Sequence, residues 1–253
     1  MSYSFKPSHR VAVRSLWLAG EIILALVRYT GLVAMHAGTP DREVRSRWLQ
    51  QVCRSALRVF CVELRAAGPI PSSGLLVCNH LSYLDVLVLG ATAPCVFVSK
   101  CEVRRWPVFG WFASLAGTIF LRRNRRSDVE RVAGEMRLVL DAGALVVLFP
   151  EGTTSDGREV LPFKSALLQS ATEQPHGLAA AFIEYSLNDG SVAEEVCYWR
   201  DMTLLPHLLN LMSKRGLEAR LCFAELKQPS TDRKQLARQL HAEVVRLKEA
   251  CAT

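Results

Sequence analysis

Several signatures of common enzyme and binding classes are missing from this sequence. Its eight cysteines form no Cys-x-x-Cys pair and show no zinc-finger spacing to histidine, so a structural zinc site and a disulfide framework are not expected. We interpret the cysteines as reduced core residues of a cytosolic compartment. No Gly-x-Ser-x-Gly elbow is present, so a serine hydrolase would lack its nucleophile. What remains is a chain of 253 residues, 50% of them hydrophobic, with the length of one large α/β domain plus a small appendage.

The N-terminal segment lacks a signal-peptide cleavage site, yet it is strongly apolar from Leu16 to Ala37. Arg14, Glu21 and Arg28 recur there at intervals of seven residues, which places their side chains on one face of a helix. Such a polar stripe favours a helix that lies in the membrane interface, or one whose polar edge packs on protein, over a lone membrane-spanning helix. The alternative is a helix docked on the protein core with a solvated edge.

A second, amphipathic helix is predicted to follow. The stretch 39–41 (Thr-Pro-Asp) provides an N-cap, a proline at the first helical position and an acid in the first turn. Apolar residues then recur at helical spacing over residues 48–61. We expect residues 1–66 to form a membrane-associated helical hairpin and residues 67–253 to form the α/β domain. The alternative is that the apolar face of the second helix only packs against the sheet.

Positive charge is concentrated near the N-terminus. The formal net charge is +7, and residues 1–60 hold nine Lys and Arg against three Asp and Glu. An anionic surface therefore meets this end of the protein first. A nucleic-acid partner is not expected, because the charge lies on a hydrophobic hairpin and no recognisable RNA- or DNA-binding motif accompanies it.

From residue 74 onward, strand and helix patterns alternate, which is typical of α/β domains. We predict strands near residues 75–78, 95–99, 118–121, 144–149, 178–184, 195–199 and 217–224. We predict helices near residues 83–91, 127–141, 163–173, 201–213 and 232–250.

The strand predicted at residues 75–78 runs directly into a polar turn that carries His80 and Asp85. On one regular helix these two side chains would point about 140° apart, because each residue turns by about 100°. They meet only if His80 stands in an irregular turn before the helix. A histidine beside a carboxylate takes a proton from a hydroxyl, with the aspartate fixing the tautomer. The pattern therefore predicts activation of an alcohol as a nucleophile.

Three further polar clusters lie where predicted strands end. Lys100 ends one strand, the run 117–123 closes another with Arg123, and the run 149–155 ends the most hydrophobic strand with Glu151 and several hydroxyl groups. Lys100 and Arg123 offer cationic hydrogen-bond donors of the kind that hold a phosphate. The turn after Glu151 offers backbone N–H groups to an anion or an oxyanion.

These clusters also have simpler interpretations. A solvated basic surface accounts for Arg125 and Arg126, and Glu151 is equally well placed to cap a helix from an ordinary loop. A metal site built from His80, Asp85 and Glu151 is not expected, because no second histidine lies nearby in the sequence and no ligand spacing supports it.

Taken together, these residues resemble the motifs of a known family. Residues 79–85 (Asn-His-Leu-Ser-Tyr-Leu-Asp) resemble NHx4D, residues 117–123 resemble GxxFxxR, and residues 149–155 (Phe-Pro-Glu-Gly-Thr-Thr-Ser) resemble FPEGTRS, in matching order and spacing. The set resembles the lysophospholipid acyltransferases of the PlsC type, commonly called 1-acylglycerol-3-phosphate acyltransferases. The resemblance covers about residues 70–185. It implies an α/β fold with a mixed, mostly parallel sheet flanked by helices, and N-terminal helices on the membrane.

The resemblance also implies a reaction and roles for individual residues. The reaction is transfer of a fatty acyl group from acyl carrier protein or coenzyme A to the free hydroxyl of a lysolipid, without a metal or a bound organic cofactor. His80 is implied to be the general base and Asp85 its partner. Gly117 and Arg123 match the motif that helps to hold the acceptor phosphate. Lys100 matches a lysine that often follows this strand in relatives.

The third motif is only partly matched. Glu151, Gly152 and Thr153 correspond to the motif that shapes the acceptor site. Thr154, however, stands where relatives have arginine, which removes a bidentate phosphate ligand. Arg158 is a candidate substitute for that arginine.

Other departures bear on the identity of the acceptor. Ala180 stands where the fourth motif of the family often has proline. The runs 153–157 and 161–165 resemble relatives that acylate lyso-ornithine lipid. The main prediction is acylation of 1-acylglycerol-3-phosphate, with lyso-ornithine lipid as the alternative acceptor. We expect a membrane-associated enzyme on the cytoplasmic face, the inner membrane if the source is bacterial. A non-catalytic lipid-binding protein is the hypothesis from a different class.

Overall fold

A single sheet organises the fold. The computed structural model describes residues 9–122, 126–172 and 176–251. Within these residues the strands hydrogen-bond in the order β1-β7-β6-β2-β5-β3-β4. Their bounds are Val62–Ala67 (β1), Gly74–Cys78 (β2), Val96–Lys100 (β3), Ile119–Leu121 (β4), Leu145–Leu148 (β5), Leu178–Leu187 (β6) and Leu217–Glu225 (β7). β6 and β7 run antiparallel and the other described pairs run parallel, which confirms the predicted mixed, mostly parallel sheet.

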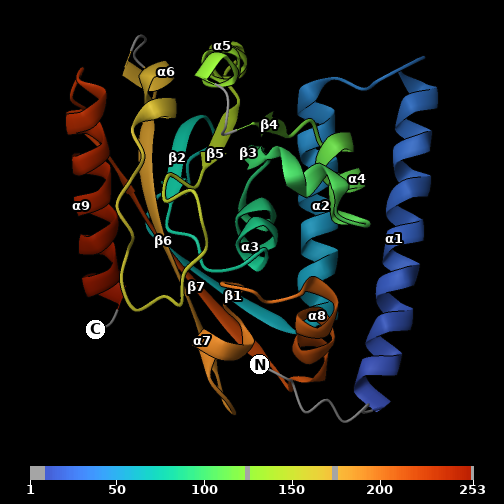
Figure 1. The fold of residues 1–253 in the computed structure, drawn as a ribbon. Coiled ribbons are helices and arrows are strands. Elements are labelled where there is room, and N and C mark those ends of the chain that lie inside the picture. The colour runs from blue at the N-terminus through green and yellow to red at the C-terminus, as the bar shows by residue number, and fades with distance from the viewer. Residues whose placement is uncertain (1–8, 123–125, 173–175, 252–253) are drawn as a thin grey trace.

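Helices cover both faces of this sheet (Figure 1). Their bounds are His9–Met35 (α1), Arg42–Phe60 (α2), Leu84–Thr92 (α3), Phe109–Leu115 (α4), Arg126–Asp141 (α5), Gln169–Thr172 (α6), Val192–Glu195 (α7), Leu204–Ser213 (α8) and Arg233–Cys251 (α9). Short 3-10 turns span Cys101–Arg105 and Ala166–Leu168. Apolar side chains of α1, α2, α3, α4 and α8 form the core on one face. Those of α5, α6 and α9 form the core on the other.

The middle strands are buried on both sides. All residues of β2 and β5 are buried, and Leu76 of β2 pairs with Val147 on one side and with Ala179 of β6 on the other. A parallel strand covered on both faces needs apolar side chains at every position, which explains the unbroken apolar run of β2. The carboxyl ends of β2 and β5 lie at the same edge of the sheet. The turns that follow these two strands are therefore neighbours.

The helix α1 is held on the protein by its polar edge. Arg14 is only 8% exposed, and its guanidinium donates to the carbonyl oxygens of Met212 at 2.9 Å and Lys214 at 2.6 Å, at the end of α8. A cation is favoured there because the last carbonyl groups of a helix carry partial negative charge. The indole N–H of Trp48 in α2 donates to the carbonyl of Ala25 at 3.0 Å. At Arg14, the predicted polar stripe therefore packs on protein.

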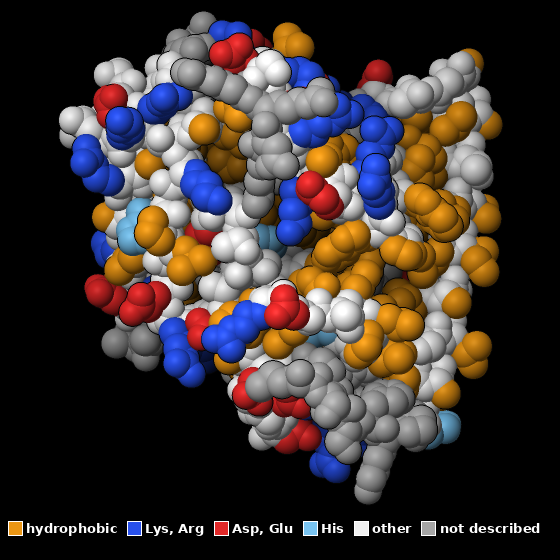
Figure 2. Space-filling model, viewed as in Figure 1, with side chains coloured by type: hydrophobic (Ala, Val, Ile, Leu, Met, Phe, Trp, Pro, Cys, Tyr) orange, Lys and Arg blue, Asp and Glu red, His pale blue; other side chains and the backbone are white. Residues whose placement is uncertain are grey.

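The opposite side of α1 is apolar and exposed. In the described part of the chain, α1 is the one helix long and apolar enough to cross a membrane, and 11% of its most apolar window is buried. Its large exposed apolar side chains are Val13, Leu16, Trp17, Ile23, Leu24, Val27 and Met35. Hydrophobic side chains line the right-hand edge of the molecule, where α1 runs (Figure 2). β1 begins at Val62 and belongs to the sheet, and the division of the chain between residues 66 and 67 stays a prediction.

One strand prediction is wrong, and one strand of the structure was not predicted. The segment 195–199 is not a strand, although Val196 and Cys197 are fully buried. It lies in a loop that crosses the turn after β2, where the N–H of Tyr198 donates to the carbonyl of Leu81 at 2.8 Å. Its residues are apolar because this tertiary contact buries them, and a short apolar run is also typical of a strand. Conversely, the edge strand β1 was not expected, because most of its residues are exposed.

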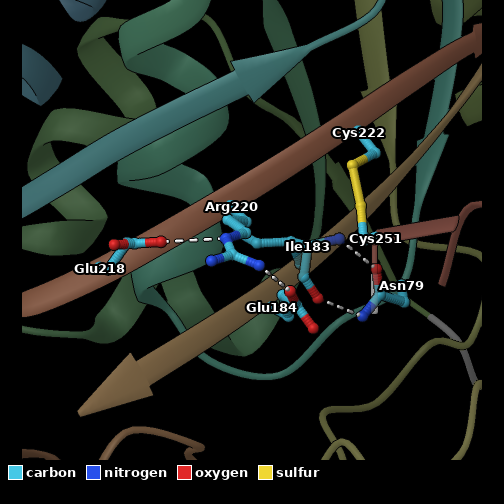
Figure 3. The surroundings of a disulfide bond; sticks show 7 residues. All are labelled: Asn79, Ile183, Glu184, Glu218, Arg220, Cys222 and Cys251. Atoms are coloured by element: carbon cyan, nitrogen blue, oxygen red, sulfur yellow. Dashed lines mark hydrogen bonds and ion pairs between the residues drawn. A yellow bond between two sulfur atoms is a disulfide. The ribbon is translucent and has the colours of Figure 1, made fainter. Parts of the chain in front are cut away.

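The cysteines do not all stay reduced as predicted. Cys222 of β7 and Cys251 of α9 are joined by a disulfide, with their Cα atoms 6.8 Å apart (Figure 3). The two residues are separated by 29 positions in the sequence, so only the packing of α9 on the sheet brings them together. The remaining six cysteines are free, and burial raises the pKa of the Cys53 and Cys197 thiols to about 12.

Candidate active site

The side chain of Asn79 fixes the point at which the chain leaves β2. Its amide nitrogen donates to the carbonyl of Ile183 at 3.0 Å, and its amide oxygen accepts from the N–H of the same residue at 2.8 Å (Figure 3). The amide therefore replaces one rung of the backbone ladder between β2 and β6. Asn79 is 3% exposed, so both hydrogen bonds are shielded from water. This anchor sets the position of the next residue, His80.

His80 and Asp85 meet in the turn before α3, as predicted. The Nδ1 atom of His80 lies 2.7 Å from Oδ2 of Asp85. The same oxygen accepts the main-chain N–H groups of Leu81 at 2.6 Å and Ser82 at 2.9 Å. Because α3 begins at Leu84, His80 stands outside the helix while Asp85 lies in its first turn. A carboxylate accepts hydrogen bonds, so Nδ1 carries the proton and Nε2 bears the lone pair.

Tyr185 of β6 is a further partner of Asp85 that the sequence did not reveal. Its hydroxyl donates to Oδ1 of Asp85 at 2.7 Å. Burial raises the pKa of Tyr185 above its ordinary value, and the nearby Asp85 charge raises it further, so the phenol keeps its proton. Asp85 is fully buried, and both of its carboxylate oxygens accept hydrogen bonds. A tyrosine five residues after Ala180 carries no sequence signal of this role, because only the β2–β6 pairing brings it to the turn.

One face of the His80 imidazole ring packs against an aromatic stack. It lies parallel to the ring of Phe149 with a centroid distance of 4.0 Å, and Phe149 stacks in turn on Phe97. The carbonyl of His80 accepts the N–H of Ser155 at 3.0 Å. The side chain of His80 remains 20% exposed. The turn after β5 therefore fixes the ring while leaving an edge open to solvent.

Glu151 is a buried acid beside this pair. It is 2% exposed, and its Oε1 atom accepts the N–H of Leu161 at 3.2 Å. Within the described residues its Oε2 atom has no hydrogen-bond partner. Burial raises the pKa of Glu151 to about 8; the main-chain N–H groups of Leu161 and His80 oppose this shift, and the Asp85 charge adds to it. Glu151 is therefore mostly protonated near pH 7. Leu161 is not in a helix, so the helix-cap interpretation is wrong.

The rest of the third motif forms an open turn. Gly152 has a positive φ of 73°, a conformation that favours glycine, and Thr153 is exposed. The hydroxyl of Thr154 donates to the carbonyl of Tyr198. Arg158 is 85% exposed and pairs with Asp156 at 3.4 Å. The residue that replaces the motif arginine therefore faces another loop, and Arg158 faces solvent.

The remaining predicted residues lie around β3 and β4. Lys100 is exposed at the end of β3 and is paired in register with Leu121. Gly117 precedes β4 and has φ 81°. The guanidinium of Arg45 covers it, since Cζ lies 3.1 Å from the point that a Cβ at position 117 would occupy. Gly117 thus makes room for an arginine of α2. Arg123 lies outside the described residues.

A metal ion has no evident set of ligands here. Among the described residues, no group of three or more His, Cys, Asp or Glu is arranged to hold one. The expectation that the reaction needs no bound cofactor stays a prediction.

Comparison with known proteins identifies the family. The Acyltransferase family model matches residues 61–182. The chain is 36% identical to the lyso-ornithine lipid O-acyltransferase of Brucella abortus, over 76% of this chain and 78% of that protein. It is 34% identical to the enzyme of the same name from Pseudomonas aeruginosa, over 87% of this chain and 90% of the relative. It is also 34% identical to the 1-acyl-sn-glycerol-3-phosphate acyltransferase of Neisseria meningitidis, over 72% of each chain.

The fold has a solved counterpart as well. The crystal structure of the 1-acyl-sn-glycerophosphate acyltransferase PlsC from Thermotoga maritima superimposes with a TM-score of 0.65, covering 95% of this chain and 97% of that one at 19% identity. At this identity the likeness concerns the fold. The sequence relatives go further, because their identity extends over most of both chains. The protein therefore belongs to the acyltransferase family that contains these enzymes, and it is a lysolipid O-acyltransferase.

Proposed function

We propose that His80 is the general base of this acyltransferase and that Asp85 orients it. The supporting observation is the 2.7 Å contact between Nδ1 of His80 and Asp85, which directs the proton of the ring inward and leaves Nε2 with its lone pair. Nε2 takes the proton of the acceptor hydroxyl while the hydroxyl oxygen bonds to the thioester carbonyl carbon. The tetrahedral oxyanion then collapses, the C–S bond breaks, and the leaving thiolate recovers the proton from Nε2. The products are the ester and a free thiol.

Asp85 and Glu151 have different tasks in this scheme. Asp85 stabilises the imidazolium that forms when His80 takes the proton, as in other histidine–aspartate pairs. Glu151, whose pKa is raised to about 8, stays neutral at the working pH and adds no second negative charge beside the base. A neutral Glu151 also does not repel an anionic substrate that binds beside this turn.

Of the two candidate acceptors, we favour lyso-ornithine lipid. The orientation of Thr154 toward Tyr198 supports this choice, because the position that carries a phosphate-binding arginine in relatives contributes no cation here. The names of the relatives from Brucella and Pseudomonas agree with it. The second candidate, 1-acylglycerol-3-phosphate, is supported by the Neisseria relative and by the exposed Lys100.

Competition between purified lysolipids tests the acceptor. We expect the purified full-length protein to show a kcat/KM for lyso-ornithine lipid at least about tenfold above that for 1-acylglycerol-3-phosphate, a difference of about 1.4 kcal/mol. Products are measured by mass spectrometry. A reversed preference would assign the protein to the second candidate. For the donor we propose a thioester of acyl carrier protein or coenzyme A, and the same assay with each thioester in turn identifies which one is used.

For localisation, we infer that the outer face of α1 enters the cytoplasmic leaflet of a membrane. Leu16, Ile23 and Val27 are 76%, 63% and 60% exposed, which is unusual for a face that meets only water. Replacing all three by Gln should release the protein from lipid vesicles in flotation. Leu138→Gln is the matched control, because Leu138 is a 67% exposed residue on α5. Equal binding of the triple variant and the control would contradict this placement.

A further inference from the structure

Lys164 lies against the turn 149–155, in which Thr154 stands in place of the motif arginine. The Nζ, Cδ and Cε atoms of Lys164 lie 2.8, 3.2 and 3.4 Å from the point that a Cβ on Gly152 would occupy. The lysine side chain therefore runs along the face of Gly152, in the space that any other residue at position 152 would fill. The φ of 73° favours glycine here, and the absence of a Cβ leaves room for the lysine side chain.

The backbone around Lys164 is fixed on both sides. Its N–H donates to the carbonyl of Pro150 at 2.9 Å, and the N–H of Leu161 donates to Glu151 at 3.2 Å. From the other side, Nε2 of His241 in α9 contacts the carbonyl of Val160 at 3.1 Å. The segment is thus pinned between the turn after β5 and α9. The main chain of Lys164 is hydrogen-bonded to the turn, and this places its side chain beside the turn.

The charge of Lys164 is available to a ligand. Among the described residues Lys164 forms no ion pair and no side-chain hydrogen bond, and it is exposed. Glu151, the acid of the turn 149–155, is largely protonated near neutral pH and so does not neutralise it. An accessible ammonium without a protein counter-ion is a suitable partner for an anionic group of a substrate.

The position of this ammonium relative to the base suits the acceptor. The N–H of Gly152 donates to the carbonyl of Phe149 at 3.1 Å, and the ring of Phe149 stacks on His80 at 4.0 Å. The N–H of Ser155 in the same turn donates to the carbonyl of His80. The turn 149–155 therefore contacts His80 at both of its ends, through Phe149 and Ser155, and carries Lys164 on Gly152 between them. A lysolipid with its hydroxyl at His80 would extend its head group along this turn.

We propose that Lys164, seated on Gly152, forms a binding subsite for the anionic group of the acceptor head group, in place of the arginine that Thr154 replaces. This inference rests on the proposed lysolipid acyltransfer at His80. The ligand is a phosphate in 1-acylglycerol-3-phosphate and a carboxylate in lyso-ornithine lipid. An ammonium binds either one as a point charge, whereas a guanidinium fork is matched to bidentate binding.

The test compares Lys164→Gln with Lys164→Arg and with Lys234→Gln. Lys234 is an exposed lysine of α9 and serves as the matched control. For each variant, kcat and KM are measured with both anionic lysolipids and with a monoacylglycerol, which has no head-group anion. We expect Lys164→Gln to raise KM for the preferred anionic lysolipid at least about tenfold, with kcat within about threefold of wild type. KM for monoacylglycerol should not change, Lys164→Arg should keep most of the affinity, and Lys234→Gln should match wild type.

Two results would overturn the proposal. One is an unchanged KM for both anionic lysolipids in Lys164→Gln, and the other is an equal loss on monoacylglycerol, which would indicate a general structural defect. Equilibrium binding of each lysolipid to the wild type and to Lys164→Gln, without a thioester donor, gives a second measurement. It should show the same tenfold weakening. If the wild type transfers no acyl group, the proposed function fails, while this binding difference still decides whether the subsite exists.

Discussion

The turn after β2 and the turn after β5 lie side by side at one edge of the sheet, but they satisfy their polar groups differently. In the first turn, Asp85 accepts hydrogen bonds from His80, from two main-chain N–H groups and from Tyr185. In the second turn, the buried Glu151 keeps one oxygen without a partner, and Lys164 is an unpaired cation among the described residues. Both carboxylate oxygens of Asp85 thus have donors from the protein, whereas one carboxyl oxygen of Glu151 has none among the described residues.

This difference agrees with the roles that we propose for the two turns. A general base must present the same nitrogen in the same direction in every cycle, so its partners come from the protein and are buried. A binding turn must leave its charges free for the ligand, since a cation already paired within the protein offers less to a substrate. The comparison predicts that substitutions in the first turn lower kcat. Substitutions in the second turn should instead raise KM or change how the stability of the protein depends on pH.

The largest effect is expected for His80→Ala. Loss of the general base should lower kcat by about 10²–10⁴-fold while KM for the lysolipid changes little. His36→Ala is the matched control, because His36 is an exposed histidine at the end of α1. Both variants should show the circular dichroism spectrum of the wild type. Transfer by His80→Ala at the wild-type rate would mean that the base lies elsewhere.

Glu151→Gln should change how stability depends on pH. The pKa of Glu151 is about 8 in the folded protein and 4.5 ordinarily, so between these values the folded state binds a proton that the unfolded chain has released. The free energy of unfolding of the wild type therefore falls as pH rises from about 4.5 to 8. The glutamine variant lacks this contribution, and its stability relative to wild type should rise over the same window, by less than about 5 kcal/mol.

Urea unfolding at a series of pH values measures this difference. The hydrogen bond from Leu161 is retained in Glu151→Gln, because the side-chain oxygen of glutamine still accepts it. If the variant and the wild type have the same pH dependence, Glu151 is ionised in the fold and the second turn is not neutral as described.

The smallest effect is expected for Tyr185→Phe. Removing the hydroxyl leaves Oδ1 of the buried Asp85 without this donor, at a cost of about 1–3 kcal/mol in the free energy of unfolding. A less firmly held Asp85 should lower kcat by roughly fivefold with KM unchanged. Tyr29→Phe is the control, because the hydroxyl of Tyr29 donates to the carbonyl of Leu115 in α4. A change in KM without a change in kcat would mean that Tyr185 contributes to substrate binding and not to the positioning of Asp85.

The contrast between the two turns also explains what could be predicted. The pairing of His80 with Asp85 was predictable, because both residues lie within one short segment and a strand end leaves few conformations for it. The α/β class was predictable from the alternation of strand and helix patterns, and the mixed, mostly parallel sheet was predictable from the family resemblance. The role of Tyr185 was not, because its contact with Asp85 spans 100 positions in the sequence. The contact of Lys164 with Gly152 was not, because it depends on how the loop between them folds back on the turn. The apolar segment 195–199 was misread as a strand, since burial in a loop leaves the same pattern as burial in a sheet.

The sequence by itself determined the family, the α/β class and the pairing of His80 with Asp85, because these depend on local patterns and on motif spacing. Only the tertiary structure decided how the site is supported. It brought the phenol of Tyr185 to Asp85, turned Thr154 toward Tyr198, and laid Lys164 on Gly152. It also joined Cys222 to Cys251 and fixed α1 through Arg14. Such contacts depend on which segments pack together, and packing is a property of the whole fold rather than of any one stretch of chain.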